Sequence, residues 1–344
     1  MRRVGRFAGL ALLTGCCLFG GRSGADTPFT PQGDGLMYTV QTTADLLHLR
    51  AGYQELLDSA YDGTLEVHFV SGGDAGGGWD LWPERKSRGA SAPPAIDLRL
   101  VGDGGPLPGT LSRVLARSVR LENLLVTGSR SVALSFEVAG PFTMSRCAVI
   151  DGRWTDPHGG EGFLVVEARR GGSEVRVAIE DSWFVRNWQA APMPMIAVRA
   201  AAHQGAVPAE VAVRRSAFLA NAFAREVSVP RAASLAVEDS VFFKNWSDGE
   251  IFACGEGVPA RVTGSVLAVP EVRYLATPSG CPGLDLAGSR LFSPPAPGTA
   301  WGARVQDPAG FPTTAMNALL VALADRGRVP DATAWTELKG LLGS

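Results

Sequence analysis

The sequence predicts an all-β fold in which the chain winds as a parallel β-solenoid, with each coil stacked on the one before. Three near copies of one motif, at residues 177–188, 211–223 and 235–246, support this prediction. Each copy reads apolar, any residue, apolar, two polar residues, Ser, any residue, aromatic, two residues and then Asn. The short alternation is typical of a strand, and recurrence of the whole motif is typical of stacked repeats.

Weaker copies begin at Val119, Phe142 and Ala260, so the starts lie about 23 to 35 residues apart. Equal positions hold similar residues, as a solenoid requires, because each coil adds a strand to the same parallel sheet about 4.8 Å above the last. The second apolar position holds Leu121, Met144, Ile179, Val213, Val237 and Val262, and a mostly small column holds Leu124, Cys147, Ser182, Ser216, Ser240 and Ser265. We expect Asn187, Asn221 and Asn245 to form a ladder that binds backbone groups left unpaired at a turn.

These columns resemble those of the right-handed parallel β-helix proteins of the pectate-lyase-like superfamily, over about residues 95–292. The resemblance implies a right-handed coil. The motif is specific for the fold and says almost nothing about activity. The Asn-Thr-Asp, Asp-Asp and Gly-His-Gly set of polygalacturonase-like hydrolases and the Arg-containing motif of pectate lyases are both missing from the sequence.

One domain can take up all 344 residues, because a solenoid grows by repetition. We divide the chain into a signal peptide (1–25), a cap with the first strands and a long loop (26–94), the coils (95–292) and a C-terminal loop with a helical cap (293–344). The formal charge is −2, and it becomes −6 (28 basic against 34 acidic residues) once the four arginines of residues 1–25 are subtracted. Nucleic acid is therefore not expected as a partner, because phosphate binding requires a basic face.

Residues 1–25 are predicted to be an export signal, because arginines precede an apolar run from Phe7 to Gly20 that is too short for a membrane span. Leu13-Thr14-Gly15-Cys16 resembles a bacterial lipobox, in which Cys16 would be lipidated and anchor the mature protein to a membrane. The alternative is ordinary cleavage after Ser23-Gly24-Ala25, which would release a secreted protein. In both cases the protein leaves the cytosol for the periplasm, the outer membrane or the medium.

Both ends of the solenoid are predicted to be covered. A helix is expected to begin at Thr42-Thr43-Ala44-Asp45 and to cap the strand edges of the N-terminal end with its apolar stripe. Residues 313–325 and 332–342 are predicted to be two short helices that cover the other end. Residues 72–94 form a long loop, which is either a mobile insertion or a flap.

Two coils, which begin at Phe142 and Val177, are about ten residues longer than the others. Loops inserted in adjacent coils emerge side by side and commonly build a binding face. Aromatic residues recur just after the predicted turn, at Trp154, Trp188, Phe223 and Trp246. If exposed they would form a platform for sugar rings, and if buried they would fill the space under the loops. With nearby charges they define a candidate carbohydrate-binding face of Trp154, Asp156, Glu161, Arg186, Trp188, Lys244, Trp246, Asp248 and Glu250.

Charged columns alternate in sign from coil to coil, which favours ion pairs between coils over free catalytic acids. These columns are Glu180, Arg214 and Glu238, and one position later Asp181, Arg215 and Asp239. The histidines show no metal-ligand spacing, so no metal or cofactor is expected, except Ca²⁺ if the protein is a lyase. Cys254 and Cys281 could pair in an oxidising compartment if geometry permits, and Cys147 is expected to be a buried thiol.

Three functions remain open at this point. The first is a non-enzymatic, exported cell-envelope protein that binds polysaccharide or another surface partner. The second is a polysaccharide lyase or glycoside hydrolase acting on an acidic extracellular polysaccharide, although no catalytic residue is identified. The third is a scaffold that serves adhesion or assembly alone.

Overall fold

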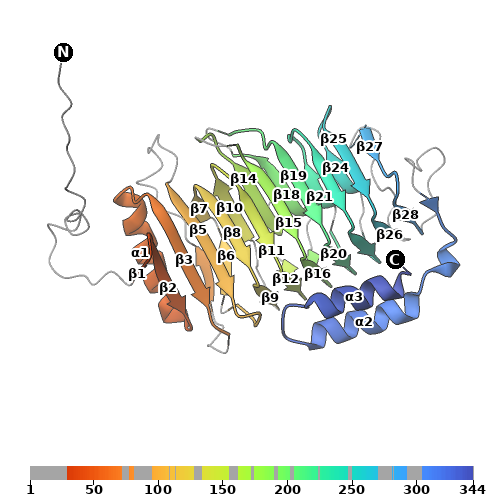
Figure 1. The fold of residues 1–344 in the computed structure, drawn as a ribbon, viewed down its shortest axis with the longest axis horizontal. Helices are drawn as coiled ribbons and strands as arrows, with labels where there is room; N and C mark the ends of the chain where they lie inside the picture. The colour runs from red at the N-terminus through yellow and green to blue at the C-terminus, as the bar shows by residue number, and fades with distance from the viewer. Residues whose placement is uncertain are drawn as a thin grey trace, which may run out of the picture.

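A computed structural model describes most of the chain from residue 29 onward. The described residues are 29–71, 77–80, 95–107, 109–112, 114–127, 134–154, 162–171, 174–189, 193–201, 205–223, 225–246, 250–269, 281, 283–292 and 304–343. In this part of the chain, three large sheets of parallel strands run side by side along the long axis of the molecule (Figure 1). None of the helices in the described residues is long and apolar enough to cross a membrane.

Three sheets, which we number I to III, form the walls. Sheet I contains β1 (Thr30–Gln32), β2 (Gly35–Val40), β3 (Gly63–Phe69), β5 (Ile96–Gly102), β8 (Ser118–Glu122), β11 (Phe142–Ser145), β15 (Arg176–Glu180), β19 (Glu210–Arg214), β22 (Leu235–Glu238), β25 (Pro259–Thr263) and β27 (Gly283–Asp285). Sheet II contains β9 (Leu125–Thr127), β12 (Ala148–Ile150), β16 (Trp183–Val185), β20 (Ala217–Leu219), β23 (Val241–Phe243), β26 (Val266–Ala268), β28 (Arg290–Leu291) and β29 (Arg304–Val305). Sheet III contains β7 (Val114–Ala116), β10 (Leu134–Val138), β14 (Leu164–Ala168), β18 (Pro194–Ala200), β21 (Arg225–Val229) and β24 (Glu250–Cys254).

Each coil passes through the sheets in the order I, II, III, so that β15, β16 and β18 belong to one coil and β19, β20 and β21 to the next. All strand pairs of the three sheets are parallel except β1 with β2 at the N-terminal edge. Two further sheets contain two short strands each: β4 (Gly77–Asp80) with β6 (Gly109–Ser112), and β13 (Arg153–Trp154) with β17 (Trp188–Gln189). This connectivity is compatible with the solenoid that the repeats predict.

The predicted register between coils is confirmed. Ile179, Val213 and Val237 lie opposite one another on adjacent strands of sheet I. On sheet II the aromatic column stacks face to face, with ring centroids of Phe184 and Phe218 4.9 Å apart and those of Phe218 and Phe242 4.6 Å apart. Equal positions therefore fill the interior layer by layer, and the apolar side chains that point into the solenoid form one continuous core.

Among the described residues, corners of the coils are made by single residues in the left-handed region. Between sheets I and II these are Asn123, Arg146, Asp181, Arg215, Asp239 and Gly264, and after sheet II they are Asp151, Arg186, Ala220 and Lys244. A non-glycine residue in this conformation costs roughly 1–2 kcal/mol. Hydrogen-bond ladders directly after each corner offset that cost.

The serine column forms one of these ladders. The backbone N–H of Ser182 donates to the hydroxyl of Ser216 (3.3 Å), and that of Ser216 donates to the hydroxyl of Ser240 (3.2 Å). Each of these hydroxyls in turn donates to the carbonyl two residues earlier in its own coil. Cys147 occupies the same column as a buried free thiol, and burial raises its pKa to about 12.

The predicted asparagine ladder is present at the second corner. Asn187, Asn221 and Asn245 are all buried, with at most 1% exposure. The Asn221 Oδ1 accepts from the backbone N–H of Asn187 (3.1 Å), and its Nδ2 donates to the carbonyl of Phe184 (3.0 Å). Asparagine suits this place because its amide carries both a donor and an acceptor.

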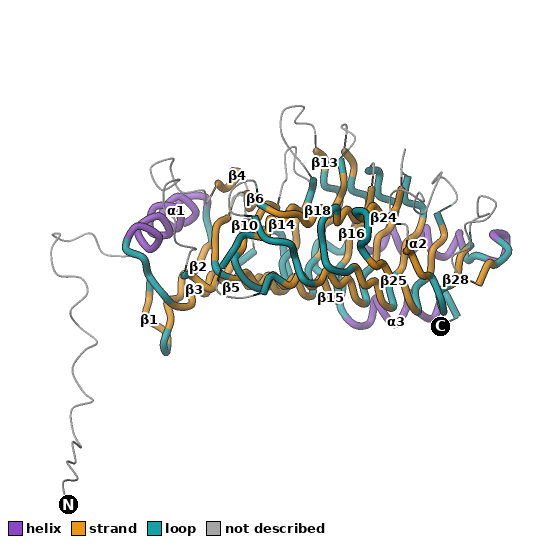
Figure 2. The backbone as a smooth tube through the Cα atoms, turned by 90° about the horizontal axis from the view of Figure 1, so that it is seen from above, coloured by secondary structure: helices purple, strands orange, loops and turns teal. Residues whose placement is uncertain are grey.

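Helix α1 (Thr43–Asp58) lies at the N-terminal end of the stack, as Figure 2 shows. It begins with a capping box in which Thr42 accepts from the backbone N–H of Asp45 and the Asp45 carboxylate accepts from that of Thr42. Leu49 and Tyr53 are buried against the solenoid core, and the Tyr53 hydroxyl donates to the carbonyl of Leu115 (2.5 Å). The helix thus covers the interior where the first coils would expose it.

The C-terminal helices α2 (Thr313–Asp325) and α3 (Ala332–Leu341) lie elsewhere than the sequence predicts. They run alongside the coils and cover the outer face of sheet II, rather than closing the C-terminal end (Figure 1). Two hydrogen bonds fix the hairpin near the two ends of that sheet: the backbone N–H of Val329 donates to the carbonyl of Gly104, and the side-chain Nη1 of Arg290 donates to the carbonyl of Leu342. Sheet II needs this cover because its strands are apolar on both faces, as the buried residues of Trp183–Val185 and Val241–Phe243 show.

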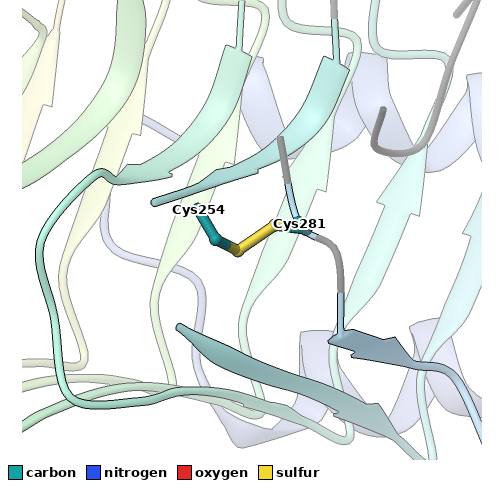
Figure 3. Close-up of a disulfide and its surroundings, with 2 residues drawn as sticks. All are labelled: Cys254 and Cys281. Atoms are coloured by element: carbon teal, nitrogen blue, oxygen red, sulfur yellow. A yellow bond between two sulfur atoms is a disulfide. The ribbon is translucent and has the colours of Figure 1, made fainter. Parts of the chain in front are cut away.

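Cys254 and Cys281, whose pairing the sequence leaves open, form a disulfide (Figure 3). Cys254 ends strand β24, and Cys281 lies two residues before β27. The two cysteines are 27 residues apart in the sequence. A cross-link over a loop of this length stabilises a fold by about 3 kcal/mol. It ties the last strand of sheet III to the segment that begins the final coil.

Candidate functional site

The candidate carbohydrate-binding face lies at the corner after sheet II, where the asparagine ladder ends. Asp156, Glu161 and Asp248 lie outside the described residues, as does Cys16, and Trp154 is described only through its backbone in β13. The site is therefore built from the remaining predicted residues, Arg186, Trp188, Lys244, Trp246 and Glu250, and from neighbours that their register reveals.

The predicted aromatic strip is divided between two columns. Trp188 is in register with Arg153 on one side and Ala222 on the other, and Ala222 is in register with Trp246. Trp154 is in register with Gln189, so it belongs to the alternate column. Side chains of adjacent strand residues point to opposite faces, and a slip of one position therefore moves a residue from one face to the other.

The structure corrects the grouping of Phe223 with the tryptophans. Phe223 is 1% exposed and packs edge to face on Phe163, with ring centroids 6.3 Å apart. The asparagine column is the reliable guide to register, because Trp188, Ala222 and Trp246 each follow an asparagine of the ladder directly. Phe223 was grouped with the tryptophans because it is aromatic, but it lies one position after Ala222, the residue in their column.

The two tryptophans of the first column are both exposed, each to 44%. They lie two coils apart, which places their backbones roughly 10 Å from each other at the usual strand spacing. Ala222 lies between them and leaves the space above the intervening coil open. Two outward indoles with a small residue between them thus form a notched apolar surface along the solenoid axis.

Cations surround this surface. Arg153, which the sequence analysis does not select, is exposed in the same column as the tryptophans, and Arg186 and Lys244 are exposed at the adjacent corner. Arg186 binds Asp151 through its Nε (2.8 Å), and this hydrogen bond raises the pKa of Arg186. Arg153 and Lys244 are both exposed, and no ion pair among the described residues joins either of them to a carboxylate.

Glu250 lies deeper than the tryptophans. It is half-buried at the start of β24, opposite Arg225 of the preceding coil.

The alternating charged columns on sheet I are paired, as predicted. Arg214 contacts Glu180 (3.2 Å) and Glu238 (3.1 Å), which lie on the coils either side of it. Arg215 binds Asp181 through two hydrogen bonds of 2.7 and 2.9 Å. These ion pairs between coils therefore support the wall of the solenoid.

A buried carboxyl that sequence reasoning missed is Glu226, on strand β21. Its side chain has no exposed surface, and neither carboxylate oxygen has a hydrogen-bond partner among the residues that the structure describes. The register places it between Met195 and Ile251 of the neighbouring coils, in an otherwise apolar position. Burial alone raises its pKa to about 8, so the group is mostly protonated at neutral pH. Alignment of Glu226 with the apolar Met195 would have predicted its burial. The coils differ in length, so this alignment is hidden in the sequence.

The described residues contain no group of three or more His, Cys, Asp or Glu side chains that could hold a metal ion. Comparison with known proteins gave no matching family model, no matching curated protein and no matching solved structure. Function is therefore argued from the geometry of the site alone.

Proposed function

We propose that the protein is an exported cell-envelope β-helix protein that binds an extended polysaccharide along its axis. The observation that supports this most directly is the pair of exposed, in-register tryptophans, Trp188 and Trp246. We also propose that the coil is right-handed, since parallel strands joined by crossovers are right-handed in about 98% of cases. A right-handed coil would agree with the resemblance to the pectate-lyase-like superfamily.

The physical basis is stacking of sugar rings on indoles. The C–H faces of a pyranose are apolar and pack on an aromatic ring, while its hydroxyls stay hydrated at the edge. A separation of roughly 10 Å between the tryptophans is close to the length of a disaccharide in an extended chain. Every second sugar could then stack, with the unit between them lying over Ala222.

Exposed cations beside the tryptophans favour an acidic chain. Arg153 and Lys244 would attract uronate or sulfate groups, whereas Arg186 is already paired with Asp151, and this contribution should weaken as salt screens it. Binding should therefore combine a salt-dependent part from these cations with a salt-independent part from the indoles.

The test is binding of purified protein to a panel of acidic and neutral polysaccharides, by calorimetry and affinity electrophoresis. Trp188→Ala and Trp246→Ala should each weaken binding to the preferred glycan about tenfold, because each removes one stacking contact. Val321→Ala, which removes another exposed apolar side chain from α2, is the matched control and should change nothing. Full binding by the Trp188→Ala Trp246→Ala double variant would rule out this face.

The same experiment separates binding from catalysis. A lyase or a hydrolase would release unsaturated or reducing sugars from the panel, with added Ca²⁺ if a lyase requires it. Among the described residues the sheet I carboxylates are paired and Glu226 is sealed in the core, so we do not propose a catalytic pair. A protein that binds no glycan but retains envelope partners on purification would instead be a scaffold.

The membrane attachment that we propose rests on Cys16 and has its own test. Cys16→Ala should move the protein from the membrane fraction to the soluble fraction, because the lipid chains on that cysteine would be the anchor. A Cys17→Ala variant is a matched control that leaves the predicted lipidation position intact. Unchanged partition of the Cys16→Ala variant would show that the lipobox is not used.

A further inference from the structure

A cleft separates the beginning of α3 from the corner between sheets I and II. Its volume is about 260 Å³, and it is lined by Arg146, Asp181, Trp183, Arg215, Pro330, Asp331, Ala332 and Trp335. This corner is the one before sheet II, whereas Trp188 and Trp246 follow the corner after it. The cleft is therefore independent of the proposed polysaccharide face.

Two indoles form the apolar part of the cleft. Trp183, on β16, is in register with Ala148 and Ala217, so it stands between two small residues on the outer face of sheet II. It is 2% exposed, and Trp335 of α3 packs on it edge to face, with centroids 5.8 Å apart and planes at 84°. Trp335 is half-buried, so its indole is the ring surface that a ligand in the cleft can reach, and Trp183 supports it from below.

Charged groups of both signs form the rim. Asp181 is held by Arg215 (2.7 and 2.9 Å), and Arg146 contacts Glu122. Asp331 caps α3 by accepting from the backbone N–H groups of Thr333 (3.0 Å) and Ala334 (3.1 Å). The bonds from Ala334 and Thr333 lower the pKa of Asp331, so it stays ionised. The lining thus contains two guanidinium groups and two carboxylates, and its formal charge is zero.

We propose that this cleft is a second ligand site, which binds a single neutral sugar ring in the pyranose form. The C–H face of such a ring is apolar and suits the indole of Trp335. Its equatorial hydroxyls point outward around the ring, where Arg215, Asp181 and Asp331 lie. Each hydroxyl can accept a hydrogen bond from a guanidinium group and donate one to a carboxylate, so a sugar can bind groups of both signs.

Other small ligands fit the lining less well. An aromatic acid would be attracted by the guanidinium groups of the rim but repelled by the carboxylates of Asp181 and Asp331, and an organic cation would face the reverse. A purely apolar molecule would leave the charged rim partly dehydrated without new hydrogen bonds. A neutral molecule with hydroxyls on all sides avoids these penalties.

Saturation-transfer NMR with methyl glycosides of glucose, galactose, mannose and N-acetylglucosamine tests the proposal. We expect at least one glycoside to bind in the millimolar range, with saturation strongest on its ring C–H protons. Trp335→Ala should weaken this binding at least about tenfold, whereas Trp188→Ala should leave it unchanged. Phenylacetate and benzylamine serve as the anionic and cationic probes, and both should bind more weakly than the preferred sugar.

Trp335 also packs on Trp183, so Trp335→Ala could weaken binding by disturbing the fold. A second variant distinguishes loss of binding from a folding defect. Arg215→Asn removes one guanidinium group while asparagine tolerates the left-handed backbone at this position (φ 45°). It should weaken the sugar several-fold with little change in the thermal midpoint. No binding by any of the four glycosides, binding that survives both variants, binding lost in Trp188→Ala, or tighter binding of either charged probe would each overturn the proposal.

Discussion

A Glu226→Gln variant is expected to be more stable than the natural chain at about pH 9 and of similar stability near pH 4. The Glu226 carboxyl has a pKa of about 8 in the fold, against an ordinary value of 4.5. Between these two values the unfolded chain has lost the proton while the folded chain keeps it, so stability falls as the pH rises. Above pH 8 the folded form ionises too, and the loss is complete.

The expected size of this effect is on the order of 4 kcal/mol, because the group is fully buried and water does not screen it. Glutamine cannot ionise, so the variant should lack this contribution to the pH dependence. Urea unfolding followed by circular dichroism across the range measures it. Glu256→Gln, at an exposed turn, is the matched control and should keep the natural pH dependence. Parallel curves for Glu226→Gln and the natural chain would contradict the prediction.

Asn221→Ala is expected to destabilise the protein by on the order of 4 kcal/mol. The Asn221 amide accepts from both the backbone N–H and the Nδ2 of Asn187, and it donates to the Phe184 carbonyl and to Asn245 Oδ1. Alanine would leave several of these groups buried and unpaired, and each costs about 1–3 kcal/mol. The corner would also keep its left-handed residue, Ala220, without the bonds that hold it.

The measurement is again the free energy of unfolding, with the thermal midpoint as a second readout. Arg176→Ala, which breaks an exposed contact with Glu174, is the control and should have little effect. If Asn221→Ala were no more harmful than this control, the ladder would be incidental to the fold.

Much of the fold was predictable because the same sequence motif recurs in successive coils. The columns of Ile179, Val213 and Val237, and of Asn187, Asn221 and Asn245, lie in register because parallel coils place equal positions above one another. The composition of the sheet II strands also indicates that both faces of this sheet are buried, which the predicted position of the C-terminal helices did not take into account. Three consecutive apolar residues, as in Val241–Phe243, indicate a strand that is buried on both faces and therefore needs a cover.

The candidate site was predicted in part. Trp188 and Trp246 are exposed and aligned, but Phe223 is buried and Arg153 takes a place that an aromatic residue was expected to fill. The error arose because aromatic character was used to align the coils, whereas the asparagine that ends each turn sets the register on which facing depends.

By itself the sequence determined which residues stack, because the spacing of a repeat is a local property that the backbone of each coil reproduces. The tertiary structure alone decided where the non-repeating parts go. Helices α2 and α3 have no repeat to align, and their amphipathic faces bury wherever a complementary apolar surface is free, which is the outer face of sheet II. The cleft beside Trp335 follows from that packing, and no linear pattern encodes it.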